Sequence, residues 1–219
     1  LYIAGYTYSE DFPTTAGAYD TSFNSVDSSY PDVFISKING DLTNLLSSTY
    51  LGGSLSDVAI IFPGSNGDVY VVGTTLSSNF PTTPGAYDTS YNGGDYDIDI
   101  FLSRLSGDLT SLIASTYLGG SSLDTFYAIG AMAMDSYSNV YVFGVTSSPD
   151  FPTTPGAFDT SFNGDIDTFV SKFNGNLTNL LASTYLGGSE DDLGYSIAIN
   201  SDGTIYVSGG TKSTDFPIT

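Results

Sequence analysis

Residues 48–54 read Ser-Thr-Tyr-Leu-Gly-Gly-Ser, and the same seven residues return at 115–121 and at 183–189. The steps between these copies are 67 and 68 residues. A second landmark, Phe-Pro-Thr-Thr or the related Phe-Pro-Ile-Thr, begins at Phe12, Phe80, Phe151 and Phe216. Because two separate motifs keep nearly the same step, the chain is built from one repeated unit.

Each repeat predicts four short strands separated by turns and by one long loop. In the second repeat the strands are expected at 58–62, 69–73, 99–105 and 112–118. Alternating apolar residues mark these runs, and turns rich in Asp, Asn, Ser and Gly supply residues that tolerate positive φ. The long loop contains Phe-Pro-Thr-Thr-Pro-Gly-Ala. Its prolines and glycine exclude a helix and indicate an ordered excursion held by Phe80 and Tyr87.

The other copies follow the same pattern. Equivalent strands are expected at 1–5, 32–38, 45–51, 128–134, 140–144, 167–173, 180–186, 195–199 and 205–209. The repeat units run over 1–53, 54–120 and 121–188, with an incomplete unit at 189–219.

A four-stranded antiparallel sheet cannot bury both of its faces alone, so the copies must stack, either radially as propeller blades or linearly as a solenoid. Radial stacking is favoured, because linear β-solenoid coils are much shorter than this period. The sequence therefore predicts an all-β fold of β-propeller blades, each a four-stranded antiparallel sheet, with about three repeats.

The charge of the chain excludes several classes of partner and chemistry. There are 24 acidic and 4 basic residues, a net charge of −20, and every acid except Glu10 and Glu190 is Asp. Asp is a turn former and a hard oxygen ligand, which favours structured loops and divalent cations over a charged helical face. So negative a chain repels phosphate backbones and anionic lipid surfaces, so no nucleic acid is expected as a partner.

The sequence also lacks Cys and His. Disulfides, imidazole catalysis, thiol nucleophiles and ordinary zinc sites are thereby excluded from this chain. It contains no apolar run of 18 residues and no recognisable signal peptide. We expect a soluble segment without direct membrane insertion, either mature or cut from something longer.

Four stretches of the chain carry a resemblance to a known family. They are Asp-Val-Phe-Ile-Ser-Lys at 32–37, Ser-Thr-Tyr-Leu-Gly-Gly at 48–53, Val-Tyr-Val-Val-Gly-Thr-Thr at 69–75 and Phe-Pro-Thr-Thr-Pro-Gly-Ala-Tyr-Asp-Thr at 80–89. Together they resemble the SBBP family, named for its seven-bladed β-propeller repeats, over essentially the whole chain. The resemblance implies a propeller within a secreted or cell-surface protein of bacteria or archaea. It brings no established catalytic residues with it.

The strand count departs from that family pattern. The chain is expected to open and to close on a second strand of the repeat, giving about 13 strands where seven four-stranded blades need about 28. This segment cannot close such a ring alone. We expect either the remainder of a longer propeller chain, or self-association in which incomplete blades are finished in trans by strand donation.

Closely spaced Asp residues in the loops before the third strand are candidate calcium ligands. The candidates are Asp95, Asp97, Asp99, Asp165 and Asp167, and Asp27 and Asp32 occupy the looser equivalent region of the first repeat. Such carboxylates repel one another unless a cation or hydrogen-bond donors satisfy them, and Ca²⁺ takes several oxygens of this kind. The spacing is not that of an EF-hand, and the alternative is an ordinary solvated acidic loop.

Lys37, Arg104 and Lys172 share one repeat position on the third strand. We expect their stems to pack while their charged heads meet an Asp or a strand-edge carbonyl, and the alternative is a ring of cations that binds an acidic ligand. Repeated tyrosines are expected to pack between sheets rather than to form a sugar-stacking platform. These tyrosines are Tyr2, Tyr50, Tyr70, Tyr117, Tyr141, Tyr185 and Tyr206.

Three functions compete. The first is a non-catalytic extracellular structural or interaction module, part of a surface layer, a filament or an adhesin, favoured by repetition and by the missing catalytic groups. The alternative is a calcium-assisted glycan-binding propeller whose repeated loops give avidity. A carboxylate-based hydrolase is disfavoured, because catalytic pairs have differentiated environments, whereas these Asp residues recur in similar contexts.

Overall fold

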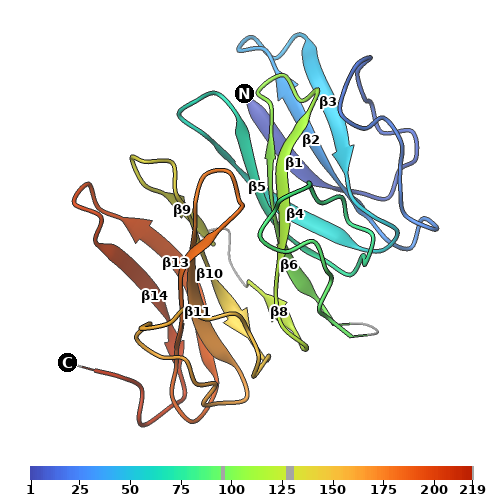
Figure 1. The fold of residues 1–219 in the computed structure, drawn as a ribbon. Helices are drawn as coiled ribbons and strands as arrows, with labels where there is room; N and C mark the ends of the chain where they lie inside the picture. The colour runs from blue at the N-terminus through green and yellow to red at the C-terminus, as the bar shows by residue number, and fades with distance from the viewer. Residues whose placement is uncertain (95–96, 127–130, 219) are drawn as a thin grey trace. The chain divides into compact units, whose positions relative to one another are not determined.

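The computed structural model describes residues 1–94, 97–126 and 131–218. In these ranges the chain has 14 strands and no helix, which confirms the all-β prediction (Figure 1). The strands are β1 (Tyr2–Thr7), β2 (Asp32–Ile38), β3 (Leu45–Leu51), β4 (Asp57–Pro63), β5 (Val69–Thr75), β6 (Asp99–Leu105), β7 (Leu112–Leu118), β8 (Asp124–Thr125), β9 (Met132–Met134), β10 (Val140–Thr146), β11 (Asp167–Phe173), β12 (Leu180–Leu186), β13 (Asp192–Ile199) and β14 (Ile205–Thr211).

The strands form four antiparallel sheets, which we name A to D. Sheet A is β1-β2-β3, sheet B is β4-β5-β6-β7, sheet C places β8 and β9 beside β10, followed by β11 and β12, and sheet D is β13-β14. Sheets B and C contain all four strands of the repeat in chain order. Sheet A has the second to fourth strands and sheet D the first and second. The strand expected at 128–134 corresponds to β9 in its described part.

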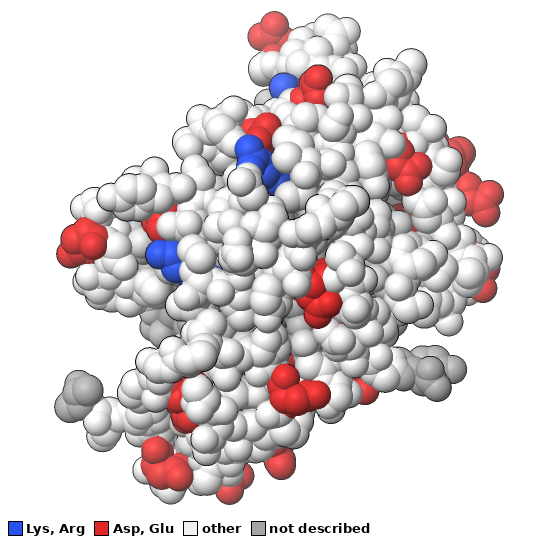
Figure 2. Space-filling view, in the orientation of Figure 1, with Lys and Arg blue, Asp and Glu red and all other residues white. Residues whose placement is uncertain are grey.

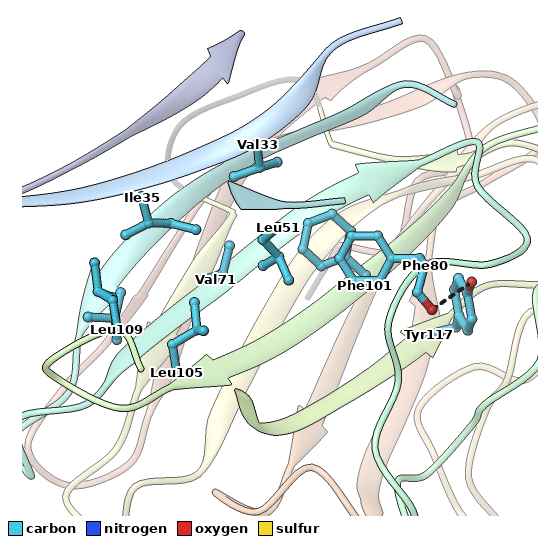
Figure 3. Packing of buried hydrophobic residues seen from close by; sticks show 10 residues of the cluster. Val33, Ile35, Leu51, Val71, Phe80, Phe101, Leu105, Leu109 and Tyr117 are labelled. Carbon is cyan, nitrogen blue, oxygen red and sulfur yellow. Dashed lines mark hydrogen bonds between the residues drawn. The ribbon is translucent and has the colours of Figure 1, made fainter. Parts of the chain in front are cut away.

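The chain divides into two compact units. The first comprises Leu1–Tyr91 and Phe101–Tyr117, and the second comprises Asn92–Ile100 and Leu118–Thr219. In the first unit, one buried cluster joins sheets A and B. Figure 3 shows Val33 and Ile35 of β2 gathered with Val71, Leu105 and Leu109. The apolar face of one repeat is thus covered by the next, as the stacking argument requires.

The second unit has the same kind of junction. Tyr141 and Phe143 of β10 pack with Ile197 of β13, so sheet D covers part of sheet C. Val170 and Val207 lie against this smaller cluster and are only half-buried.

The long loop of each repeat runs along the outer edge of the fourth strand. In the second repeat, the Thr83 amide donates to the Ser115 carbonyl at 3.0 Å and the Tyr117 amide donates to the Asp88 carbonyl at 3.0 Å. The Phe80 ring, as predicted for this loop, is buried and stacks on Phe101 with 4.0 Å between ring centroids. The loop therefore satisfies an edge that would otherwise be open to pairing with another chain.

Three leucines in the turns between the third and fourth strands have a left-handed backbone. The φ angles are 58° at Leu42, 60° at Leu109 and 56° at Leu177. This conformation is uncommon for a residue other than glycine, and burial of the side chain offsets its cost at only two of the three positions. Leu109 and Leu177 are fully buried, whereas 67% of Leu42 is exposed.

Gly73 on β5 is required by close packing. A Cβ there would overlap the Phe101 ring and the main-chain carbonyl of Val58. At the equivalent Gly5 of β1, a Cβ would meet only the Phe34 ring, at 3.0 Å. We expect Gly73→Ala to lower the free energy of unfolding by about 2 kcal/mol or more, and Gly5→Ala to change it by less than about 1 kcal/mol. Urea unfolding of both variants checks this, and equal losses would contradict it.

Candidate functional site

Two Asp side chains meet at each junction between consecutive repeats. One begins the third strand of a repeat and the other begins the first strand of the next. We call these sets the carboxylate pairs, and they are Asp32 with Asp57, Asp99 with Asp124, and Asp167 with Asp192. All six side chains have no exposed surface.

The main chain holds each pair together. The Asp57 amide donates to the Pro31 carbonyl at 2.9 Å, and the Asp124 amide donates to the Ile98 carbonyl at 2.7 Å. The Asp192 amide donates in the same way to the Ile166 carbonyl, at 2.8 Å. The start of one repeat is therefore attached to the residue that precedes the third strand of the repeat before it.

One oxygen of each carboxylate is well supplied with donors. For the second member of each pair, Oδ2 accepts from a glycine amide at 2.6–2.7 Å and from a serine hydroxyl. For the first member, Oδ2 accepts from the amide of Asn24, Asn92 or Asn163 at 2.6–2.8 Å. These donors fix the rotamers of both carboxylates.

Four of these carboxylates have a second, buried oxygen to which the structure shows no hydrogen bond. This holds in the described part of the chain for Oδ1 of Asp57, Asp124, Asp167 and Asp192. In the first pair, Asp32 Oδ1 accepts from the Ser25 hydroxyl at 2.8 Å. An unsatisfied carboxylate oxygen inside a protein is costly, so it calls for a proton or a cation.

Burial and like charge change the titration of these groups. The pKa of Asp57 and of Asp124 is raised to about 7. Burial is the main cause, the charge of the paired Asp32 or Asp99 adds to it, and hydrogen bonds that favour the ionised form act against it. Burial likewise raises the pKa of Asp167, where Asp192 and Asp159 add to the effect. The pKa of Asp32 is also raised, chiefly by burial.

The structure separates the residues that the sequence put forward as calcium ligands. Asp99 and Asp167 belong to carboxylate pairs, whereas Asp97 is half-buried and Asp165 is exposed. Asp95 lies outside the described residues. Within the described ranges, no three acidic side chains gather into a ready metal site. Of the looser region in the first repeat, Asp32 belongs to a pair and Asp27 is exposed.

Sequence reasoning missed the second member of each pair. Asp57, Asp124 and Asp192 each stand four residues after the Gly-Gly dipeptide that ends the preceding repeat, and each lies 25 residues after its partner. This regular spacing was a usable signal.

Arg104 and Lys172 meet an Asp as predicted, whereas Lys37 meets a carbonyl of the turn after β6 and not of a strand edge. Lys37 Nζ donates to the Gly107 carbonyl at 2.7 Å, Arg104 pairs with Asp68 at 2.6 Å and Lys172 lies 3.5 Å from Asp135. Blue atoms lie beside red ones in Figure 2, as these pairs require. Each cation also lies over a tyrosine ring of its own sheet. The cations are thus engaged within the protein.

Most of the repeated tyrosines are buried as predicted, with one exception at sheet D. Tyr50, Tyr117 and Tyr185 are buried, and the Tyr117 hydroxyl donates to the Ser77 carbonyl at 2.8 Å. Tyr206 is 59% exposed, against 4% for the equivalent Tyr141. The packing prediction is wrong for Tyr206, because no described strand lies on its face of sheet D.

No protein-family model matches this chain, and no curated protein is significantly similar to it. The resemblance to SBBP repeats therefore stays a prediction. Among the described residues, no helix is long and apolar enough to span a membrane. The chemistry of the carboxylate pairs follows from burial alone: a substrate has no access to them, so a pair can hold a proton or a small cation.

The raised pKa values predict how stability depends on pH when divalent cations are removed by a chelator. Between about pH 4, where unfolded Asp titrates, and about pH 7, the folded protein keeps protons that the unfolded chain has lost. The stabilisation from these protons is complete below about pH 4 and is lost as pH rises toward 7. The loss at Asp57 is on the order of 4 kcal/mol.

Urea unfolding of the wild type and of Asp57→Asn across this range measures that loss, because the amide does not titrate. The wild type should lose free energy of unfolding relative to the variant as pH rises. Asp150→Asn is the control: hydrogen bonds from Ser121 lower the pKa of Asp150, so its contribution has the opposite sign. A constant difference between wild type and Asp57→Asn would contradict the assignment.

Proposed function

We propose that this chain is a non-catalytic structural module that acts outside the cytoplasm and associates with a second copy of itself through sheets A and D. The observation that carries the proposal is the contrast between equivalent residues. Tyr141 is buried under sheet D, whereas Tyr206 is exposed, and Leu109 is buried against sheet A, whereas Leu42 is exposed. The exposed residues repeat the side chains that join repeats inside each unit.

A groove in the second unit supports the same conclusion. It has a volume of about 510 Å³ and is lined by Phe158, Val170 and Leu181, among others. Val170 corresponds to Ile35 of sheet A, which is fully buried in the cluster that contains Leu105 and Leu109. In the first unit, therefore, Leu105 of a third strand and Leu109 of the turn after it fill the place that corresponds to this groove. Sheet D has no such strand among the described residues.

We infer that the β2-β3 hairpin of a second copy occupies this groove. Strand β14 would replace strand β1 of the second copy, since both are second strands of the repeat with a Tyr at the same position. The product is a sheet β13-β14-β2-β3 with the strand order of sheets B and C. Leu42 of the second copy would then enter the groove of the first. Such a head-to-tail contact generates rings or filaments, as expected for a surface layer, a filament or an adhesin.

Association should therefore depend on concentration and on the exposed apolar residues of sheets A and D. We expect Leu42→Asp and Tyr206→Asp each to weaken it about tenfold or more, because each removes an apolar side chain from the contact. Sedimentation over a range of concentrations measures this. Ile113→Asp is the matched control, since Ile113 and its equivalents Leu46 and Leu181 are exposed in every repeat. A chain that stays monomeric at all concentrations would refute the proposal.

The register can be tested by cross-linking, because the chain has no native Cys. In β1 and β2, Tyr2 is opposite Lys37. If β14 takes the place of β1, Tyr206 will face Lys37 of the second copy. Mixing the single variants Tyr206→Cys and Lys37→Cys under oxidation should give a mixed disulfide dimer. Replacing Tyr206→Cys by Ile113→Cys should not, and equal yields would rule out this register.

A calcium-assisted glycan-binding role is a second proposal, favoured by one feature of the second unit. A groove of about 460 Å³ combines the exposed ring of Tyr137 with the polar side chains of Asp135, Asn200 and Asp202. Aromatic rings beside hydrogen-bonding groups are suited to sugars. A glycan array in calcium buffer should show binding by the wild type that Tyr137→Ala reduces. Absence of binding would remove this alternative.

A further inference from the structure

Each carboxylate pair brings two acidic side chains into a site that excludes water. The pairs recur with the same main-chain bond and the same donors on Oδ2 at all three repeat junctions. A feature kept in three copies, each with full burial of both side chains, is a built site rather than a chance meeting of surface acids. This reasoning does not depend on how copies of the chain associate.

A glycine forms the wall of each site. A Cβ on Gly52 would lie 2.6 Å from Asp32 Oδ1 and 3.0 Å from Asp57 Oδ2. Gly119 and Gly187 meet the corresponding atoms of the other two pairs. Both carboxylates of a pair thus face the same glycine, and any side chain there would fill the space that they share. The first glycine of the repeated Gly-Gly dipeptide is explained by this site.

The unsatisfied oxygens point to a missing positive charge. In the third pair, Asp167 Oδ1 lies against Gly187 beside Asp192 Oδ2 and has no hydrogen-bond partner in the described part of the chain. In Asp57, Asp124 and Asp192 it is Oδ2, not Oδ1, that faces the shared glycine, so the third pair carries this observation. The described ion pairs of the chain join Arg104, Lys172 and Lys212 to Asp residues outside the carboxylate pairs, and Lys37 donates to the Gly107 carbonyl. The charge must therefore come from outside the chain.

We propose that each carboxylate pair binds one divalent cation of the calcium type, giving three sites per chain. Oxygen ligands alone, with no His or Cys, select a hard cation over zinc. One divalent ion neutralises both carboxylates, whereas a single proton leaves one negative charge in a water-free site. Two carboxylates are fewer ligands than Ca²⁺ takes, so main-chain carbonyl and hydroxyl oxygens of the surrounding chain have to complete the shell. The ion would tie the third strand of one repeat to the first strand of the next.

The test is calcium titration of the full chain after chelator treatment and dialysis, followed by isothermal calorimetry and thermal unfolding. We expect three ions bound per chain and a higher unfolding temperature in calcium. Asp124→Asn should lower the stoichiometry by one. Asp108→Asn, which removes an exposed carboxylate of the turn between β6 and β7, should leave it at three. The triple variant Asp57→Asn, Asp124→Asn, Asp192→Asn should bind none.

Terbium provides a second readout that does not require the variants to be fully stable. Tyr50 is close enough to Asp32, and Tyr185 to Asp124 and Asp167, for these charges to affect the titration of the rings. Excitation of tyrosine should therefore produce terbium luminescence in the wild type, and added calcium should compete it away. Luminescence that survives in the triple variant would place the ions elsewhere and overturn the proposal.

Two further outcomes would also overturn it. One is the absence of calcium uptake by the wild type. The other is that Asp124→Asn stabilises the protein in chelator while calcium has no effect on the wild type. An amide mimics a protonated carboxyl, so that result would mean that the pair shares a proton and binds no cation.

Discussion

The apolar face of each small sheet has to be covered by the next copy of the repeat, because a sheet of up to four strands is too thin to bury both of its faces. In the first unit, Leu109 from sheet B packs with Ile35 of sheet A. In the second unit, Ile197 from sheet D packs on Phe143 of sheet C. Side chains of the same type are left in solvent where no described sheet follows, as at Tyr206 of sheet D, or where none precedes, as at Leu42 beside sheet A. The exposed apolar surface is thus the same surface that holds each unit together.

Edges of the sheets are managed separately from their faces. The Phe-Pro-Thr-Thr loop covers the fourth strand and bonds to its main chain, while Phe80 is stacked on Phe101 beneath it (Figure 3). The loop takes up many residues of the repeat and forms no strand. It covers the outer edge of the sheet, so pairing of another strand with the fourth strand is blocked there.

The carboxylate pairs link electrostatics to this stacking. Asp57 begins a strand of one sheet and is bonded through its amide to Pro31, which precedes a strand of the sheet before it. Two buried like charges at such a junction oppose stacking unless they are neutralised. The stability of the junction is therefore coupled to whatever neutralises the pair. The raised pKa of Asp57 reflects this coupling, because burial at the junction and the charge of Asp32 favour the protonated carboxyl.

Much of this architecture is readable in the sequence. The period, the positions of most strands and the turns follow from local residue patterns, although β8 was not predicted and β13 begins three residues earlier than expected. The acidic partner of Arg104 was predicted correctly, because a lone cation on a strand needs an acceptor nearby, whereas Lys37 meets a turn carbonyl. The calcium candidates were only partly informative. They were chosen as neighbours in one loop, whereas Asp99 and Asp167 meet carboxylates 25 residues further along the chain.

The amino-acid sequence by itself determined that the chain is an all-β repeat whose only metal-binding chemistry is that of oxygen ligands, since strand periodicity and residue types are local properties. Only the tertiary structure decided which carboxylates share a dry site and which tyrosines stay in solvent. Both depend on how one sheet lies on the next. The burial of Asp57 beside Asp32 and the exposure of Tyr206 both result from that stacking. Neither could be predicted from the residues next to Asp57 or Tyr206 in the sequence.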